Sequence, residues 1–272
     1  PIFIFVFISL AYVYLRYTKP IYEAHSVIQL GSIDEGKKIV NIENVSTLGD
    51  ELSSNVELLK SELILKEALK RLKLNVSYFS KGDILTEEKY KATSYLILPL
   101  TLKDSAIVGR QIFVSTEGKQ LILEYDFNGH QTDKIDIGST YENEFFKILV
   151  TVKNWEVLTT SLEENKLFFV FNDFGQLARA YLPNLNVKVI NPEAKSIQIT
   201  YRSNNPELSK NLVESVVQTF FQHDFEKKQK GSAKILSFIT KQLDSISFEL
   251  ELSEVKIKNF KQQNKVPNPK IE

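Results

Sequence analysis

Apolar residues recur every seven positions near the end of the chain, and this repeat restricts the fold more than any other feature. The first row contains a leucine or isoleucine at positions 236, 243, 250 and 257, and a second row follows three residues after each. A seven-residue repeat over about four heptads is typical of a long helix that packs along its length against another helix. The residues expected to mediate oligomer or helix packing are Leu236, Ile239, Leu243, Ile246, Leu250, Ile257 and Phe260, and Ser253 is the polar member of the second row.

The start of the chain carries an almost continuous apolar segment, IFIFVFISLAYVYL, at positions 2–15. At about 1.5 Å per residue this segment forms a helix of about 21 Å, shorter than the ~30 Å hydrocarbon layer of a membrane. We therefore interpret residues 1–19 as a transmembrane helix truncated at its N-terminal end, with tyrosines and a cation at the membrane interface. The expected anchor residues are Ile4, Phe7, Tyr12, Tyr14 and Arg16.

Two other interpretations of this segment stay open. A cleaved signal peptide has a similar apolar length, but it needs small residues before the cleavage site, where this chain has bulky ones. A buried core helix is apolar on one face, whereas Phe, Ile and Val surround this one. The positive-inside rule places Arg16 and Lys19 in the cytoplasm, although two charges before a large domain carry little weight.

The composition argues against several classes of function. The chain has 34 basic and 34 acidic residues, whereas a nucleic-acid-binding protein usually has a basic excess. It has no cysteine, which excludes disulfide scaffolds, thiolate metal sites and cysteine nucleophiles. The absence of methionine indicates a fragment of a longer protein, and the ten glycines form no phosphate-binding motif.

The first half of the remaining chain predicts a strand, a loop and a helix in turn. We expect a strand at 21–30, a polar loop at 31–49 and one amphipathic helix at 50–72. The expected apolar face of that helix is Leu52, Val56, Leu59, Leu63 and Leu69.

The middle of the chain is β-rich. Strands are predicted at 95–102, 111–115, 121–127, 145–152 and 167–171, with turns at Glu117-Gly118 and Asn128-Gly129. This block predicts a small antiparallel sheet or barrel-like insert. Two more strands follow within 184–202, separated by a turn at Asn191-Pro192.

Two helices are expected at the end. Asn205 is a suitable N-cap for the first, and Pro206 occupies the first helical position, where its missing amide donor costs nothing. Gly231 is expected to break or bend the connection to the heptad helix. Pro267 and Pro269 end the heptad pattern.

No constellation of side chains predicts catalysis or metal binding. The three histidines, His25, His130 and His223, fall in different predicted elements without metal-ligand spacing. We interpret Glu87-Glu88 and Glu163-Glu164 as solvated pairs, because nothing apolar nearby would raise their pKa values. The basic run at 227–230 is interpreted as a solvated helix face and Trp155 as a core residue. We therefore assign no catalytic, cofactor-binding or metal-binding residue.

Three motifs are more informative in their order than singly. The stretch KPIYEAHSVIQL begins at Lys19, SSNVELLKSELILKEALKRLKL begins at Ser53, and SIQITYRSNNPELSKNLVESVVQTFF begins at Ser196. In this order they resemble the strand entry, the first helix and the Asn-Pro-Glu start of the long helix in the bacterial chain-length determinant (Wzz) family. The β-rich block resembles the larger Wzc-type subgroup, whose members carry a cytoplasmic tyrosine autokinase.

The resemblance implies an α+β fold. It consists of a periplasmic mixed α/β domain with a β-rich insert and a long membrane-distal helix, preceded by a transmembrane helix. The expected segments are 1–19 for the transmembrane helix, 20–94 and 183–230 for the two parts of the α/β domain, 95–182 for the β-rich insert, and 231–272 for the heptad helix with the start of the return segment.

The resemblance also implies a polysaccharide co-polymerase of the bacterial inner membrane. Most of this segment would be periplasmic and would form a homo-oligomeric ring, commonly an octamer in the autokinase subgroup. The ring would regulate chain length and export of capsular or exopolysaccharide, with a polysaccharide polymerase and an outer-membrane export channel as partners and no nucleic acid. No cofactor is expected in this segment, whereas a second membrane helix and a tyrosine-protein kinase using ATP and Mg would lie beyond residue 272. A membrane-fusion or adaptor subunit of an export system, and an enzyme anchored to the membrane, stay open as alternatives.

Overall fold

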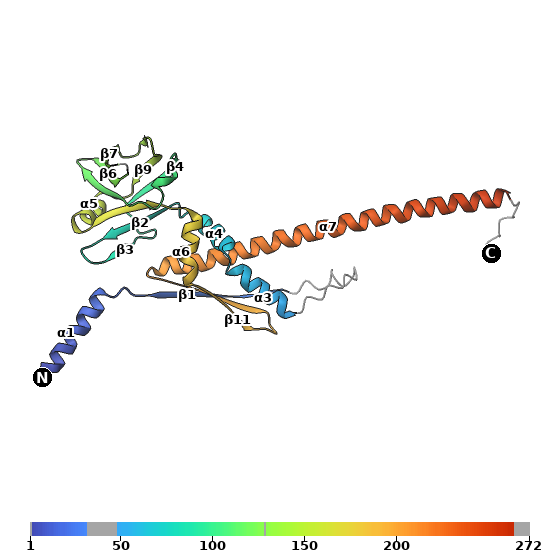
Figure 1. Ribbon diagram of the computed structural model, residues 1–272, viewed down its shortest axis with the longest axis horizontal. Coiled ribbons are helices and arrows are strands. Elements are labelled where there is room, and N and C mark those ends of the chain that lie inside the picture. The colour runs from blue at the N-terminus through green and yellow to red at the C-terminus, as the bar shows by residue number, and fades with distance from the viewer. Residues whose placement is uncertain (1, 32–47, 128, 264–272) are drawn as a thin grey trace. The chain divides into compact units, whose positions relative to one another are not determined.

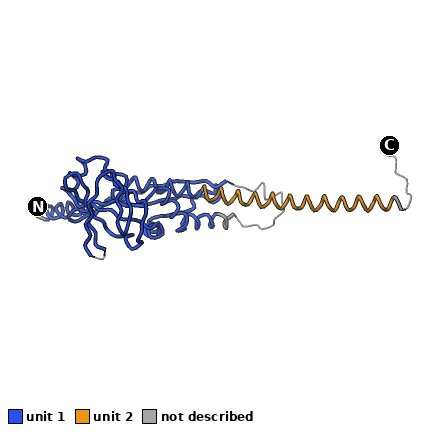
Figure 2. Tube along the Cα trace, turned by 90° about the horizontal axis from the view of Figure 1, so that it is seen from above, with its two compact units in different colours: residues 1–220 blue, residues 221–272 orange. Residues whose placement is uncertain are grey.

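The computed structural model describes residues 2–31, 48–127 and 129–263 (Figure 1). The chain divides into two compact units, residues 1–220 and residues 221–272 (Figure 2). Helices and antiparallel sheets both contribute to the structure, which confirms the predicted α+β class.

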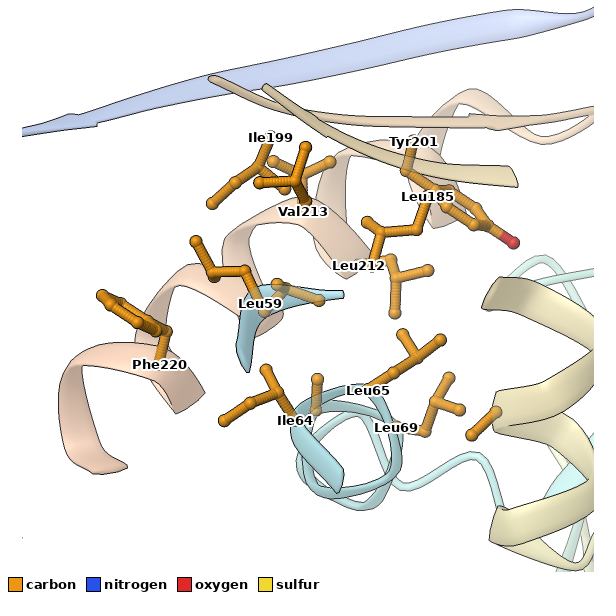
Figure 3. Close-up of a cluster of buried hydrophobic side chains, with 14 of the residues drawn as sticks. Leu59, Ile64, Leu65, Leu69, Leu185, Ile199, Tyr201, Leu212, Val213 and Phe220 are labelled. Atoms are coloured by element: carbon orange, nitrogen blue, oxygen red, sulfur yellow. The ribbon is translucent and has the colours of Figure 1, made fainter. Parts of the chain in front are cut away.

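The first hydrophobic core of unit 1 lies between a small antiparallel sheet and several helices (Figure 3). The sheet contains β1 (Tyr22–Gln29), β12 (Ser196–Ser203) and β11 (Leu185–Asn191), with β12 in the middle. The helices are α3 (Leu48–Leu59), α4 (Glu62–Arg71), α6 (Phe174–Tyr181) and the first turns of α7 (Pro206–Gln263). Leu65, Tyr201 and Leu212 meet here, each at most 1% exposed. The strands predicted at 21–30 and within 184–202 are therefore confirmed.

The helix predicted for residues 50–72 is in fact two helices. Ser61 separates them, because its Oγ accepts a hydrogen bond from Ile64 N at 3.3 Å and caps α4. This cap resets the phase of the apolar repeat. As a result the prediction was wrong for Leu63, which is 55% exposed, whereas Ile64 and Leu65 are buried. The loop predicted at 31–49 lies mostly outside the described residues, and α3 begins at Leu48.

The second hydrophobic core of unit 1 is formed by two antiparallel sheets and the helix α5 (Trp155–Glu164). Among the described residues the strand orders are β3-β2-β10-β5-β6-β7 and β4-β9-β8. The first sheet comprises β2 (Val76–Lys81), β3 (Thr86–Glu88), β5 (Ile112–Glu117), β6 (Gln120–Asp126), β7 (His130–Asp136) and β10 (Lys166–Phe171). The second comprises β4 (Tyr95–Leu102), β8 (Thr140–Glu142) and β9 (Phe146–Val152). Short 3₁₀ helices occupy Ser105–Ile107 and Leu182–Asn184.

All five strands predicted in this block are confirmed within two residues at each end. The turn at Glu117-Gly118 is present, with Gly118 at a φ of +59°. Asn128 of the other predicted turn lies outside the described residues, and its neighbour Gly129 has a φ of +110°.

Several elements of unit 1 were not predicted, namely β2, β3, β7, β8, α5 and α6. The edge strand β7 has the polar sequence HQTDKID with one buried residue, Ile135, so its alternation is weak. The two helices are short, and each begins at a capping side chain, Asn154 for α5 and Asp173 for α6. The strands β2 and β3 lie in the predicted segment 20–94, yet they pair in the same sheet as β10 of the predicted insert. The segment boundaries given above stay predictions.

The long helix α7 is continuous from Pro206 to Gln263. The predicted break at Gly231 was wrong, because one glycine inside a helix costs only about 1 kcal/mol relative to alanine. The predicted start is confirmed, since Asn205 Oδ1 accepts a hydrogen bond from Leu208 N at 3.0 Å. Pro267 and Pro269 lie outside the described residues.

The apolar N-terminal segment forms the helix α1 (Ile2–Tyr17), which ends before Pro20 as predicted. Of the described residues, none of α1 belongs to either hydrophobic core. None of the helices in the described part of the chain is both long enough and apolar enough to cross a membrane.

Candidate functional site

The seven residues predicted to mediate helix packing lie on one side of α7. Leu236, Leu243 and Leu250 are 66%, 58% and 59% exposed. The others are exposed as well, namely Ile239, Ile246, Ile257 and Phe260. A helix advances roughly 100° per residue, so residues three and four positions apart share one side. We call this set the seam.

A second apolar row on α7 was missed in the sequence. It contains Phe248, Leu252 and Val255, which are exposed and spaced by four and three residues. With roughly 100° per residue, they lie on the side of the helix opposite Leu250. Phe248 and Val255 are seven residues apart, which is the spacing of a heptad repeat. The positions seven residues before Phe248 and Leu252 are the polar Lys241 and Ser245, so the repeat does not continue toward the N-terminus. We call these three residues the opposite row.

The expected anchor residues are all exposed on α1. The group comprises Ile4, Phe7, Tyr12, Tyr14 and Arg16. Because α1 contributes to neither core among the described residues, the packing of unit 1 does not use its apolar surface. This observation disfavours the interpretation of the segment as a buried core helix.

A cavity of about 310 Å³ in unit 1 is lined by residues of the first core and by residues of β2 and β3. Glu88 of β3, Tyr181 of α6 and Tyr201 of β12 face it. The Tyr181 hydroxyl donates a hydrogen bond to Glu88 Oε1 at 3.3 Å. Lys19, just after α1, donates from Nζ to the Thr86 carbonyl at the edge of the same cavity. The cavity therefore gathers aromatic and charged side chains that are far apart in the sequence.

The interpretation of Glu88 as a solvated acid was wrong. Burial raises the pKa of its carboxyl above the ordinary value of 4.5, while hydrogen bonds from Tyr181 and Ser77 act in the opposite direction. Its neighbour Glu87 is exposed, and the Glu87 Oε2 atom lies 2.6 Å from Lys89 Nζ. Successive side chains of a strand point to opposite faces, so one member of the acidic pair faces protein and the other faces solvent. The Glu87-Glu88 dipeptide has no apolar alternation that would predict a strand. The sequence therefore did not show that the two side chains face different environments.

The two tyrosines beside Glu88 are also perturbed. Burial is the main cause that raises the pKa of Tyr181 and of Tyr201, and the nearby negative charge of Glu88 raises both pKa values further. Both hydroxyls therefore stay protonated and can donate hydrogen bonds throughout the physiological pH range.

The other candidates from the sequence lie apart from one another. His25 is on β1, His130 is on β7 and His223 is on α7. Within the described residues no group of three or more metal-binding side chains comes together. Glu163 and Glu164 are exposed at the end of α5, as predicted. Trp155 packs against the second core, which confirms its predicted structural role.

Exposed apolar rows are present on α1 and α7, and exposed apolar surfaces of this kind often mark sites of association. A comparison with family models gives a more specific result. The model described as Wzz: Chain length determinant protein matches residues 2–72. The matched segment contains α1, β1, α3 and α4, and the match supports the resemblance to chain length determinants. It does not support the assignment to the Wzc kinase subgroup. The comparison with curated proteins gave no match.

Proposed function

We propose that this chain is the periplasmic and membrane-anchoring part of a polysaccharide co-polymerase that regulates the length and export of capsular or exopolysaccharide. The observation that carries the proposal is the match of residues 2–72 to the chain length determinant model. That segment joins the apolar helix α1 to β1 and α4 of the first core. In this proposal α1 belongs to the bacterial inner membrane and the cores of unit 1 lie in the periplasm.

We further propose that the protein acts as an oligomeric ring. A ring with head-to-tail contacts requires each subunit to present two different surfaces, one to each neighbour. The seam and the opposite row of α7 meet this requirement, because they are apolar and lie on opposite sides of one helix. Full burial of one leucine side chain stabilises an interface by about 1.5–3 kcal/mol.

The remaining expectations belong to the same proposal. A polysaccharide polymerase and an outer-membrane export channel are the proposed partners. A second membrane helix and a tyrosine kinase domain, which would bind ATP and Mg, are proposed for the full-length protein of the larger subgroup.

The first experiment measures the mass of the full-length protein. Light scattering in mild detergent, with the detergent mass subtracted, should give a large closed oligomer. A stable monomer or trimer would contradict the ring and favour an adaptor subunit of an export system.

The second experiment tests the seam. Leu243→Asp and Leu250→Asp should each lower the sedimentation coefficient of the oligomer, because a charge in an apolar interface must be desolvated. Thr240→Asp is the matched control, since at roughly 100° per residue it adds the same charge to an exposed position between the two rows. Unchanged sedimentation of both leucine variants would count against packing through the seam.

The third experiment tests the activity in cells. A bacterial strain without its own chain length determinant should recover a defined modal polymer length when it expresses the full-length protein. Polymer lengths that stay random, with normal expression and membrane insertion, would refute the proposed function.

A further inference from the structure

The cavity beside Glu88 combines aromatic rings with planar polar groups. The rings of Tyr181 and Tyr201 have centroids 5.9 Å apart and planes inclined by 36°. Tyr201 is 1% exposed, so the partly exposed Tyr181 is the one that offers an apolar ring with a hydroxyl at its tip. The Glu88 carboxyl and the Asn204 amide, which also line the cavity, each present two polar atoms in one plane. The volume of about 310 Å³ falls at the lower end of the range for small-molecule sites.

The fold leaves part of this hydrogen-bonding capacity unused. Asn204 donates from Nδ2 to the Pro20 carbonyl at 2.9 Å, but its Oδ1 accepts no hydrogen bond from any described residue. The neighbouring Asn205 is different, since its Oδ1 already caps α7. Asn204 is exposed, so its free oxygen is accessible to a ligand.

The charges around the cavity nearly cancel. Among the described lining residues, Lys19 is the cation and Glu87 and Glu88 are the acids. Glu87 Oε2 lies 2.6 Å from Lys89 Nζ, so this acid is already paired, and Lys19 and Glu88 are left as one cation and one acid at the cavity. A phosphate group would lack a cluster of cations here, and a metal ion would lack a cluster of anions. The electrostatics therefore favour a neutral ligand.

We propose that this cavity binds a neutral pyranose unit of a polysaccharide. A pyranose has an apolar face of C–H groups, which suits the ring of Tyr181. Its hydroxyls both donate and accept hydrogen bonds, which suits the Glu88 carboxyl and the Asn204 oxygen. The inference rests on the proposed function for the source of the sugar, because a chain length determinant operates on a growing polysaccharide.

Saturation-transfer NMR with the full-length protein tests this site. The protein is placed in phospholipid nanodiscs, because the sugar head groups of glycosidic detergents would compete for the cavity. The probes are methyl α-D-glucopyranoside, N-acetylglucosamine and glucuronate. We expect saturable binding of a neutral sugar with a Kd on the order of 1 mM, which corresponds to about 4 kcal/mol. Glucuronate should bind at least fivefold more weakly.

Two substitutions assign the binding to the cavity. Asn204→Ala removes the free acceptor from an exposed position and should weaken neutral-sugar binding at least fivefold. Glu88→Leu removes the carboxyl and should have at least the same effect. Asn186→Ala is the matched control, because Asn186 is an exposed asparagine on β11 that does not line the cavity.

Three results would overturn the assignment. These are the absence of saturable binding of every probe, neutral-sugar binding that Asn204→Ala leaves unchanged, and glucuronate binding as tight as that of the neutral sugars. Asn204→Ala decides the matter even if Glu88→Leu fails to fold. If the sugars do not bind but the full-length protein still restores a modal polymer length in cells, the cavity assignment fails and the proposed function stands. Loss of the modal length in the wild-type complementation test would instead refute the proposed function.

Discussion

The hydroxyl of Tyr78 joins the two sheets of the second core, so Tyr78→Phe should loosen β4. Tyr78 lies on β2, and its hydroxyl oxygen accepts a hydrogen bond from Ile97 N at 2.8 Å. The same hydroxyl lies 3.3 Å from the Ile97 carbonyl oxygen, to which it can donate. Because β4 is an edge strand, this outward-facing amide has no neighbouring strand as a partner. Burial raises the pKa of Tyr78 to about 12, so the hydroxyl stays protonated at neutral pH.

The expected effect follows from the burial of Ile97. This residue is 4% exposed, so its amide loses its acceptor without gaining full access to water. A buried donor left without a partner costs about 1–3 kcal/mol. In hydrogen exchange limited by local opening, that range corresponds to an increase of about 5- to 160-fold in the exchange rate of the Ile97 amide.

The neighbouring Tyr95 supplies a matched comparison. Its ring centroid is 5.3 Å from that of Tyr78, and the side chain is 2% exposed. The Tyr95 hydroxyl has no hydrogen-bond partner among the described residues. Tyr95→Phe therefore removes a buried polar atom without breaking a hydrogen bond, and it should leave the exchange of β4 unchanged or slow it.

Hydrogen exchange followed by mass spectrometry on β4 peptides measures both variants. Tyr22→Phe, at an exposed position on β1, controls for the loss of a hydroxyl elsewhere. If Tyr78→Phe changes the exchange by less than twofold, or if Tyr95→Phe accelerates it equally, the assigned role of the Tyr78 hydroxyl is wrong.

Two further perturbations test Glu88 and the start of α7. The raised pKa of Glu88 means that its contribution to stability is fully present below the ordinary value of 4.5 and is lost as pH rises through the raised value. In thermal unfolding, Glu88→Gln should therefore gain stability relative to the wild type as the pH rises from 4.5 to neutral. A difference in melting temperature between the two proteins that does not change with pH would contradict this. Asn205→Ala should destabilise the protein by about 1 kcal/mol, because Leu208 N loses its capping oxygen, whereas Asn205→Asp should retain most of the stability. Equal losses in the two Asn205 variants, measured by denaturant unfolding, would show that the cap does not matter.

The parts of the fold that were predictable have strong and regular local signals. The strand at 95–102 was predicted with its observed limits, since apolar residues dominate it. Asn205 followed by Pro206 predicted the start of α7, because both residues have one favoured position at a helix N-terminus. In contrast, Gly231 was given too much weight, since its local cost is small compared with the rest of a long helix.

The cavity could not be predicted, because it depends on tertiary packing. Glu88 lies on β3, a strand of three residues with the sequence TEE that has no apolar alternation. Tyr181 lies at the end of a short helix, and Tyr201 arrives from a distant strand. What brings them together is the approach of β3 to the first core, and no pattern within a single segment encodes that approach. The seam was easier to find, because its residues share one helix.

The two cores are built from different parts of the sequence, and this difference sets the order in which they can form during synthesis. The second core draws its buried residues from a single stretch, Val76 to Phe171, so it can be completed as soon as that stretch has left the ribosome. The first core needs Ile28 on β1 together with Phe220 on α7. At ~5–20 residues per second, the roughly 50 residues between Phe171 and Phe220 take about 2–10 s to synthesise. Until β12 ends at Ser203, β1 lacks its full pairing partner, and until Phe220 is made the apolar face of α4 lacks part of the first core. Ile28, Ile64 and Leu65 therefore stay without the rest of their core until the first turns of α7 have been made.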